Sequence, residues 1–228
     1  SKSILYYTDN RLDPEIMQRV QDQLLKMGLP IVSVSLKPIN FGENIVLPLE
    51  RGYLTMFKQQ LAGLERSKGD MVYFCEHDVL YHPSHFDFTP PRNDVYYYNE
   101  HTYKVDSNSG QALFYYTKQT SGLCANRDLL IQHYKERVRR VEAEGFSRKM
   151  GFEPGTHSPP NGVDHFKAEA FWSEVPNVDI RHSKNLTESR WSQEQFRSQR
   201  SCKGWKMVDD VPCWGRTKGR FNEFLKEI

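Results

Sequence analysis

The feature that most constrains the fold is a strand–helix–strand pattern at the beginning of the sequence. Ser3–Thr8 is an apolar run rich in Ile, Leu and Tyr, which predicts a buried strand. A helix is predicted to run from its N-cap Asp13 to about Met27, and a second, β-branched strand covers Pro30–Leu36. Two strands joined through a helix lie parallel in one sheet with a right-handed crossover. The chain is therefore expected to form an α/β fold around a mostly parallel central sheet flanked by helices.

Later segments continue this alternation. Apolar runs of strand length are found at Met71–Cys75, Asp94–Asn99, Ala112–Lys118 and Val178–Arg181. Further helices are predicted over about Glu50–Lys68, Arg127–Glu144 and Asp164–Trp172. Loops are predicted at Lys37–Pro48 and Gly145–Gly162. With 228 residues and no internal repeat, the sequence predicts one domain with a C-terminal extension.

The composition is typical of a globular protein. Hydrophobic residues make up 38% and charged residues 26%, and no apolar run approaches the length of a membrane span. No cysteine pair is spaced as CxxC, which indicates reduced thiols and a cytoplasmic location for the four cysteines Cys75, Cys124, Cys202 and Cys213.

Charge is distributed unevenly along the chain. Arg181–Ile228 contains 11 Lys and Arg against 6 Asp and Glu, a local charge of +5, whereas the whole chain carries +2. A basic tail suits an anionic ligand such as a diphosphate or a nucleic-acid backbone. A solvated basic surface would have the same pattern.

Two acidic residues follow the apolar run Met71–Cys75 directly, in the sequence Glu76-His77-Asp78. On an extended chain Glu76 and Asp78 point to one face, and ligands collect at the carboxyl ends of parallel strands. Two neighbouring carboxylates repel each other unless a cation lies between them, and hard oxygen ligands favour Mg²⁺ or Mn²⁺. The pattern predicts a metal site here, although two exposed acids in a turn would give the same sequence.

A zinc site is the alternative at this place. Its ligands would be Cys75, His77, His82 and His85, which fall within eleven positions. Their spacing matches no usual zinc finger, and on an extended chain the first two point away from the acids.

Two motifs lead into this site: Gly52-Tyr-Leu-Thr-Met-Phe-Lys-Gln-Gln and Gly69-Asp-Met-Val-Tyr-Phe-Cys-Glu-His-Asp. They resemble the nucleotide-sugar half of GT-A glycosyltransferases. In that family a helix that begins near a glycine and carries basic or amide residues leads into the strand before a DxD motif, which here would be Glu76-His77-Asp78. The resemblance implies that the donor nucleotide is bound by Thr8, Asp9, Arg11, Gly52, Lys58 and Glu76.

The later part of the chain follows the order of elements in the same family. Asp164, a short predicted helix, the strand Val178–Arg181 and then His182 are similar to a segment in which an acid faces the acceptor and a histidine completes the metal site. Asp179–Trp191 also resembles a stretch of phage and environmental glycosyltransferase-like proteins. The resemblance covers about residues 3–190. It implies a catalytic domain over 1–190, with a nucleotide-sugar half (1–118) and an acceptor half (119–190), and a basic extension (191–228) that packs on the same domain.

The activity that the resemblance implies is transfer of a sugar from a nucleotide-diphosphate sugar, such as a UDP-sugar, to an acceptor hydroxyl. Mn²⁺ or Mg²⁺ would be held by Asp78, Glu76 and His182 and would act as a Lewis acid. Lys184 and Arg190 would bind the phosphates.

The resemblance also implies a general base and a sugar-binding segment. The base would be Asp164, with Glu153 as the second candidate. The sugar would lie against Ser121 and Gly122, where small residues allow a close approach. A plain helix N-cap for Asp164 and an ordinary turn at Ser121–Gly122 are the alternatives.

Two other functions are compatible with the same residues. A nucleotidyltransferase would use the acids to hold Mg²⁺ and a triphosphate, although the turn after the first strand lacks the glycines of a phosphate loop. A non-enzymatic nucleic-acid-binding domain would use the basic tail and its tryptophans. The phage-like resemblance adds a hydroxymethylated base in DNA to the candidate acceptors, beside glycans, lipids and proteins.

Overall fold

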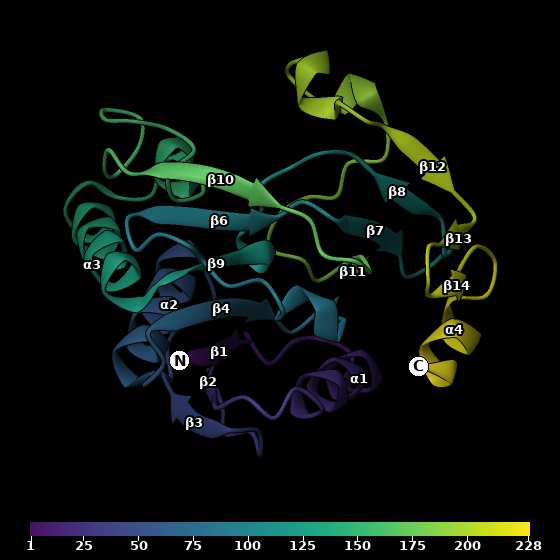
Figure 1. Ribbon diagram of the computed structural model, residues 1–228, viewed down its shortest axis with the longest axis horizontal. Helices are drawn as coiled ribbons and strands as arrows, with labels where there is room; N and C mark the ends of the chain where they lie inside the picture. The colour runs from purple at the N-terminus through teal and green to yellow at the C-terminus, as the bar shows by residue number, and fades with distance from the viewer.

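The computed structural model describes residues 1–228 and has an α/β fold (Figure 1). The strands of its larger sheet are β1 Lys2–Tyr7, β2 Ile31–Ser35, β3 Glu43–Val46, β4 Met71–Glu76, β6 Val95–Asn99, β9 Leu123–Asn126 and β10 Lys167–Phe171. Their order is β10-β6-β9-β4-β1-β2-β3. All neighbours are parallel except at β9, which is antiparallel to both β4 and β6. The predicted mostly parallel central sheet is confirmed.

Helices cover both faces of this sheet, and they are α1 Pro14–Leu25, α2 Tyr53–Arg66 and α3 Arg127–Glu144. Side chains of β1 alternate between the two faces. Ile4 and Tyr6 pack with α1 in one core cluster, whereas Leu5 and Tyr7 pack with α2 and α3 in the other. Burial on both faces explains why the central strands are continuous apolar runs. None of the helices combines the length and the apolar character needed to cross a bilayer.

A second sheet of five short strands stands beside the first. Its order is β12-β8-β7-β11-β5, and its members are β5 Val79–Leu80, β7 Thr102–Asp106, β8 Ala112–Phe114, β11 Asn177–Arg181 and β12 Lys206–Val208. β5 follows β4 after only two residues, so the chain passes from one sheet to the other at His77–Asp78. This crossing places the polar end of β4 between the two sheets.

The C-terminal segment packs on the same body. β12 pairs with β8, and the hairpin of β13 (Asp210–Val211) and β14 (Gly215–Arg216) leads into the last helix α4 (Phe221–Glu227). Phe221 and Phe224 are buried in the core cluster that contains α1, and Trp214 Nε1 donates a hydrogen bond of 2.7 Å to the Pro176 carbonyl oxygen.

Several predicted elements were wrong. Asp164–Trp172 is not a helix, because Lys167–Phe171 forms β10 at the sheet edge, and pairing with β6 overrides the helix propensity of its Lys, Ala and Glu. Lys37–Pro48 is not entirely a loop, because it contains β3, and the strand predicted over Ala112–Lys118 ends at Phe114. The strands β5, β7 and β9 were not predicted.

Tyr81 joins the two sheets near the end of β4. Its side chain is fully buried, and its hydroxyl accepts a 3.0 Å hydrogen bond from the Glu76 N–H while it donates one of 2.8 Å to the Ser121 carbonyl oxygen.

We expect Tyr81→Phe to lower the free energy of unfolding by about 1–3 kcal/mol, because two buried backbone groups lose their partner. Urea unfolding measures this change. The control Tyr116→Phe alters an exposed ring, and equal stability of both variants would contradict the prediction.

Candidate active site

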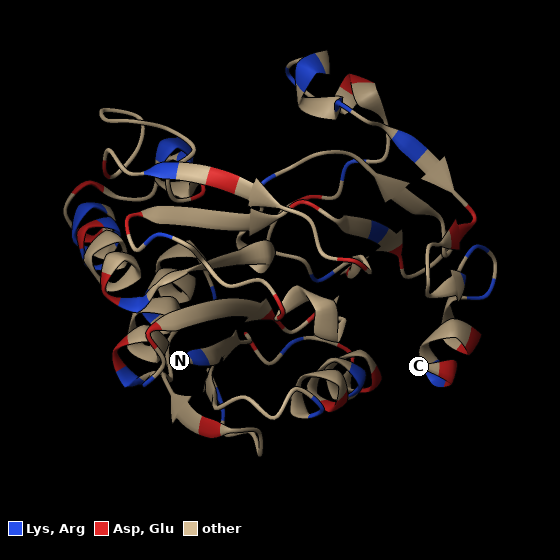
Figure 2. Cartoon of the chain, in the orientation of Figure 1, with Lys and Arg blue, Asp and Glu red and all other residues tan.

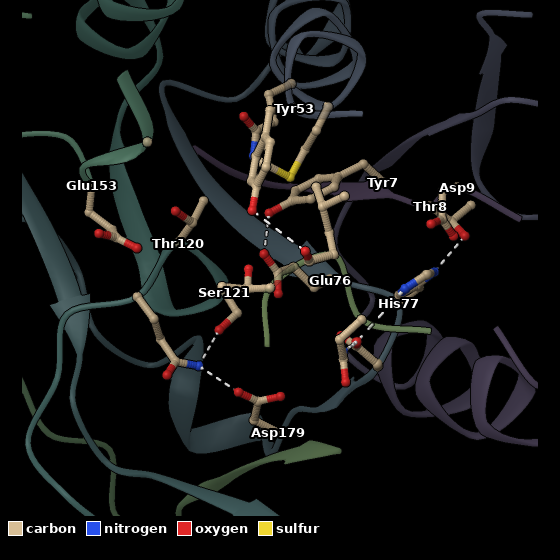
Figure 3. Close-up of a pocket in the computed structure, with 18 of the residues that line it drawn as sticks. Tyr7, Thr8, Asp9, Tyr53, Glu76, His77, Thr120, Ser121, Glu153 and Asp179 are labelled. Atoms are coloured by element: carbon tan, nitrogen blue, oxygen red, sulfur yellow. Dashed lines mark hydrogen bonds and ion pairs between the residues drawn. The ribbon is translucent and has the colours of Figure 1, made fainter. Parts of the chain in front are cut away.

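A cavity of about 380 Å³ opens at the carboxyl ends of β1 and β4, between the two sheets (Figure 3). Tyr7 and Glu76 enter it from the larger sheet, and Lys104 and Asp179 from the smaller one. The start of α2 and the segment 184–190 complete the wall. Ligands of α/β proteins collect at the carboxyl ends of parallel strands, and here two such strands end in polar residues at one cavity.

The acidic motif changes direction inside this cavity. β4 remains extended through Glu76, and the chain then turns at His77 and Asp78. The turn breaks the alternation that would place both carboxylates on one face. Glu76 instead accepts a hydrogen bond of 2.8 Å from the Tyr7 hydroxyl, and it is absent from the group of potential metal ligands. Glu76, predicted as a metal ligand, is therefore not among the side chains that converge on a common point.

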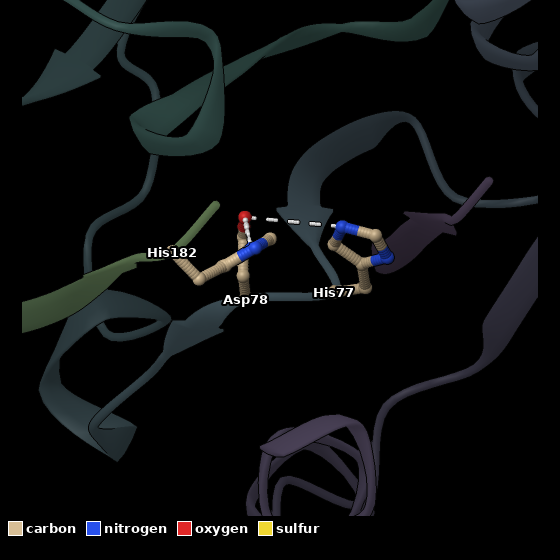
Figure 4. A group of neighbouring side chains, drawn as sticks. All are labelled: His77, Asp78 and His182. Carbon is tan, nitrogen blue, oxygen red and sulfur yellow. Dashed lines mark hydrogen bonds and ion pairs between the residues drawn. The ribbon is translucent and has the colours of Figure 1, made fainter. Parts of the chain in front are cut away.

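The potential metal ligands that do converge are His77, Asp78 and His182 (Figure 4). Their ligand atoms all lie within 4.8 Å of one another. Asp78 Oδ2 lies 3.0 Å from His182 Nε2 and 3.8 Å from His77 Nε2. The predicted Asp78 and His182 are thus brought together from positions far apart in the sequence, and His77 takes the place that had been assigned to Glu76.

Neighbouring groups orient both imidazoles. His77 Nδ1 lies 2.6 Å from Thr8 Oγ1, so a proton on Nδ1 leaves the lone pair of Nε2 free for a cation. His182 Nδ1 accepts a 3.1 Å hydrogen bond from the Lys184 N–H, and Asn185 Nδ2 donates to Asp78 Oδ2 at 2.8 Å. If His182 binds a cation through Nε2, its ring proton must lie on Nδ1. Nδ1 could then no longer accept a hydrogen bond from the Lys184 N–H, which would have to turn away. Two imidazoles and one carboxylate are a donor set for Mn²⁺, Fe²⁺ or Zn²⁺, so the residues fit a divalent cation after this small change.

The pKa values of the two acids of the motif are shifted in opposite directions. Burial would raise the pKa of Asp78, but the hydrogen bond from His182 and the charges of His77, His182 and Arg181 together lower it below its usual value. Burial and the nearby charge of Asp78 together raise the pKa of Glu76 well above its usual value, and the hydrogen bond from Tyr7 offsets only part of this rise. Asp78 is therefore the carboxylate that carries the negative charge.

A polar network lines the side of the cavity formed by the second sheet. Gln119 Nε2 lies 2.6 Å from Ser121 Oγ and 3.2 Å from Asp179 Oδ2, and Gln119 Oε1 accepts a hydrogen bond of 2.8 Å from Lys104 Nζ. Lys104 also lies 4.4 Å above the ring of Tyr115. Burial lowers the pKa of Lys104 to about 8, although the charge of Asp179 acts in the opposite direction.

Glu153 and Arg137 lie in the cavity wall without an ion pair. The Glu153 carboxylate has no side-chain hydrogen bond, and desolvation raises its pKa even though the charges of Arg137 and Lys104 lower it. Arg137 is 4% exposed, and its Nε has no hydrogen-bond partner. Its guanidinium lies 5.0 Å from the Phe57 ring. Glu153 is therefore a carboxylate that faces the cavity and is available to act on a ligand.

The segment 184–190 lies along the cavity and is held by hydrogen bonds to its backbone. Arg51 donates one of 2.8 Å to the Lys184 carbonyl oxygen, and Arg181 donates one of 2.7 Å to that of Thr187. Arg51 also pairs with Asp9 Oδ2 at 2.5 Å. These contacts fix the backbone of the segment. The side chains of Lys184 and Arg190 line the cavity and form no ion pair, since the nearby Asp9 and Asp179 pair with Arg51 and Arg181.

The remaining predicted site residues divide into two groups. Those that line the cavity are Thr8, Asp9, Gly52, Glu76, Asp78, Ser121, Glu153, Lys184 and Arg190. Arg11, Lys58 and Gly122 do not line it, and Lys58 instead pairs with Glu142 at 3.0 Å. Arg51 lines the cavity at this place, and its guanidinium pairs with Asp9.

Asp164 does not line the cavity either. One oxygen of its carboxylate, Oδ2, accepts hydrogen bonds of 2.8 Å from the Tyr96 hydroxyl and 2.7 Å from His133 Nδ1, on the side of the sheet covered by α3. The preference for Asp164 over Glu153 as a base depended on a helix that is in fact β10. These contacts hold the Asp164 carboxylate outside the cavity.

The alternative zinc ligands do not converge. Cys75 is fully buried in the core, and the imidazole of His85 lies 3.0 Å from Asn99 Nδ2 and 3.2 Å from Asn177 Nδ2. All four cysteines are free thiols. His77 was predicted only as a ligand of this alternative zinc site, whereas the structure places it beside Asp78 and His182. Arg51 was not predicted, and its position directly before Gly52 was the one indication in the sequence.

Comparison with known proteins gives no family and no curated relative, because no family model and no curated protein matches the chain. Several solved structures are similar in part. A glycosyltransferase involved in glycosylation of the major capsid of the virus PBCV-1 has a TM-score of 0.46 at 8% identity, over 78% of this chain and 91% of that one.

Two further structures show the same level of similarity. A Drosophila β-1,4-galactosyltransferase 7 in complex with manganese, UDP-Gal and xylobiose has a TM-score of 0.43 at 12% identity, over 85% of this chain and 78% of that one. A nucleotidyl transferase from Methanothermobacter thermautotroptrophicus has a TM-score of 0.40 at 9% identity, over 59% and 75%. Similarity this weak says nothing about activity.

The cluster of His77, Asp78 and His182 predicts measurable binding of a divalent cation. We expect Asp78→Asn and His182→Ala each to weaken Mn²⁺ binding at least about tenfold, because each removes one of three donors. Isothermal titration calorimetry measures the affinity. His165→Ala, which removes an exposed histidine outside the cluster, is the matched control. Equal affinity in all variants would exclude this site.

Buried histidines predict a loss of stability in mild acid. Burial lowers the pKa of His133 to about 4 and that of His85 to about 3, against 6.5 in an exposed imidazole. Both are neutral in the folded protein, whereas the unfolded chain binds protons below pH 6.5. The free energy of unfolding should therefore fall as the pH drops from 6.5 towards 4. Urea unfolding should show a shallower pH dependence in His133→Gln, and an unchanged slope would refute this origin.

Proposed function

We propose that this protein is a metal-dependent glycosyltransferase that transfers a sugar from a nucleotide-diphosphate sugar to an acceptor hydroxyl. The observation that carries the proposal is the composition of one cavity. His77 and Asp78 of the ligand cluster line it, together with two cationic side chains without ion partners, Lys184 and Arg190, and the unpaired carboxylate of Glu153. These are the groups needed to bind a diphosphate, neutralise it as it leaves, and accept a proton.

The donor would bind with its diphosphate at the metal-ligand cluster. His77, Asp78 and His182 would hold Mn²⁺ in preference to Mg²⁺, because two of the three donors are imidazoles, and the cation would supply Lewis-acid stabilisation of the leaving diphosphate. Lys184 lies two residues beyond His182, so its ammonium would bind a phosphate oxygen from the same side, and Arg190 would add a second positive charge. The nucleoside would extend towards Thr8, Asp9 and Gly52, which line the cavity at the end of β1 and the start of α2.

The sugar and the acceptor would occupy the part of the cavity near Ser121 and Glu153. Glu153 would accept the proton of the acceptor hydroxyl as its oxygen forms a bond to the anomeric carbon. The bond between that carbon and the diphosphate oxygen breaks at the same time, and the nucleoside diphosphate leaves with the electron pair. A raised pKa makes Glu153 a better base than an exposed glutamate, and this single displacement would invert the anomeric configuration.

Turnover of Glu153→Gln tests the assignment of the base. With a donor found by screening UDP-, GDP- and CDP-sugars for Mn²⁺-dependent thermal stabilisation, we expect diphosphate release to fall about 10²–10⁴-fold while donor binding remains, because only the proton acceptor is lost. Asp164→Asn is the matched control, and its turnover should stay near that of the native protein once its folded fraction is confirmed. A larger loss in Asp164→Asn than in Glu153→Gln would reverse the assignment.

The product separates this proposal from a nucleotidyltransferase. Release of a nucleoside diphosphate from a nucleotide-sugar supports glycosyl transfer, whereas release of pyrophosphate from a nucleoside triphosphate supports the alternative. Full turnover in excess EDTA, or in Asp78→Ala, would refute the metal-dependent mechanism.

A further inference from the structure

The face of the smaller sheet opposite the cavity carries aromatic rings. Along β7 and β8, Lys104 and Tyr115 face the cavity, whereas the alternate residues Tyr103 and Phe114 face the other way. Lys206 of β12 pairs with Phe114 in register, and its Nζ lies 5.8 Å from that ring and 5.7 Å from the ring of Tyr103. This face therefore carries residues that the proposed transfer reaction does not use.

Two large aromatic rings are exposed at this face. Trp172 is 50% exposed and stacks on His101, with ring centroids 4.1 Å apart and planes 13° apart. Tyr116 is 41% exposed, and its ring centroid lies 5.7 Å from that of Trp172. His101 covers one face of the indole and fixes the plane of the ring. The exposed parts of Trp172 and Tyr116 can therefore stack against another planar ring.

The cations beside these rings have no acidic partner. Lys203 Nζ lies 6.0 Å from the Tyr116 ring, and neither Lys203 nor Lys206 takes part in an ion pair, although Lys218 and Arg216 further along do. Arg197 and Arg200 also lack ion pairs, so four cations recur every third residue before and within β12. The only acid in Trp191–Lys206 is Glu194. Figure 2 shows these basic positions on the turns that precede β12 and on β12 itself.

We infer that this aromatic–lysine surface, formed by His101, Tyr116, Trp172, Lys203 and Lys206, binds single-stranded nucleic acid. Exposed aromatic rings stack on unpaired bases whatever their sequence, and a row of unpaired cations follows the phosphates. A neutral glycan would use the rings but not the cations. A fully paired duplex would use the cations but not the rings. The inference does not depend on the proposed transferase activity.

Fluorescence anisotropy with a labelled oligothymidylate of about 20 nucleotides tests the surface, because that length exceeds the sites such surfaces occupy. The assay contains neither a divalent cation nor a nucleotide-sugar, so its result is separate from the success or failure of the transferase proposal. We expect Trp172→Ala and Tyr116→Ala each to weaken binding at least about fivefold. Phe166→Ala, which removes an exposed ring elsewhere, should leave it unchanged.

Salt dependence tests the cations independently of the rings. With one phosphate contact for each of Arg197, Arg200, Lys203 and Lys206, the slope of log K against log salt concentration should be about −3. The double variant Lys203→Gln/Lys206→Gln should reduce it to about −1.5. Lys26→Gln, at an exposed and unpaired lysine at the end of α1, should leave the slope unchanged. No binding at low salt, equal binding of duplex DNA, equally tight binding of a heparin fragment, or indifference to both sets of variants would overturn the inference.

Discussion

The structure around the cavity depends on one buried negative charge, the carboxylate of Asp78. This residue is only 5% exposed, and a carboxylate in such a place destabilises the fold unless it is paired and hydrogen-bonded. His182 and Asn185 contact its Oδ2, and its backbone carbonyl oxygen accepts a hydrogen bond from the Ile180 N–H. Through these contacts the end of the larger sheet, the strand β11 and the segment that follows β11 are fixed to one another, which closes the cavity between the two sheets.

Some polar side chains of the cavity are paired with one another and others are not, and the unpaired groups are the ones available to a ligand. Asp9 and Arg51 satisfy each other, as do Lys104 and Gln119, so those groups hold the wall in shape. Glu153 and Arg190 are not satisfied in this way. A polar group that is kept from water without a partner is costly in a folded protein, so such groups are expected where a ligand supplies the missing partner.

The differences between prediction and structure have one cause. In each case a local sequence pattern was extended into a segment whose conformation is set by tertiary contacts. Glu76 and Asp78 would share a face only if β4 continued, but the chain leaves the sheet after Glu76 and brings His77 to Asp78 instead. The sequence of β10 favours a helix by composition, yet its place beside β6 makes it a strand. Once that segment is a strand, Asp164 lies with Tyr96 and His133 outside the cavity, whereas Glu153 lines the cavity without an ion pair.

The β–α–β start, the apolar central strands and the polar residues where β1 and β4 end could all be predicted from the amino-acid sequence, because they depend on periodicity, burial and turn residues that are close together in the chain. The order of the elements also indicated that Asp78 and His182 belong together. That His77 joins this pair, that Glu153 and not Asp164 lines the cavity, and that aromatic rings and lysines gather on the opposite face of the smaller sheet became evident only in the folded chain. Each of these depends on contacts between residues tens of positions apart, whose geometry is set by the pairing of strands and the packing of the two sheets.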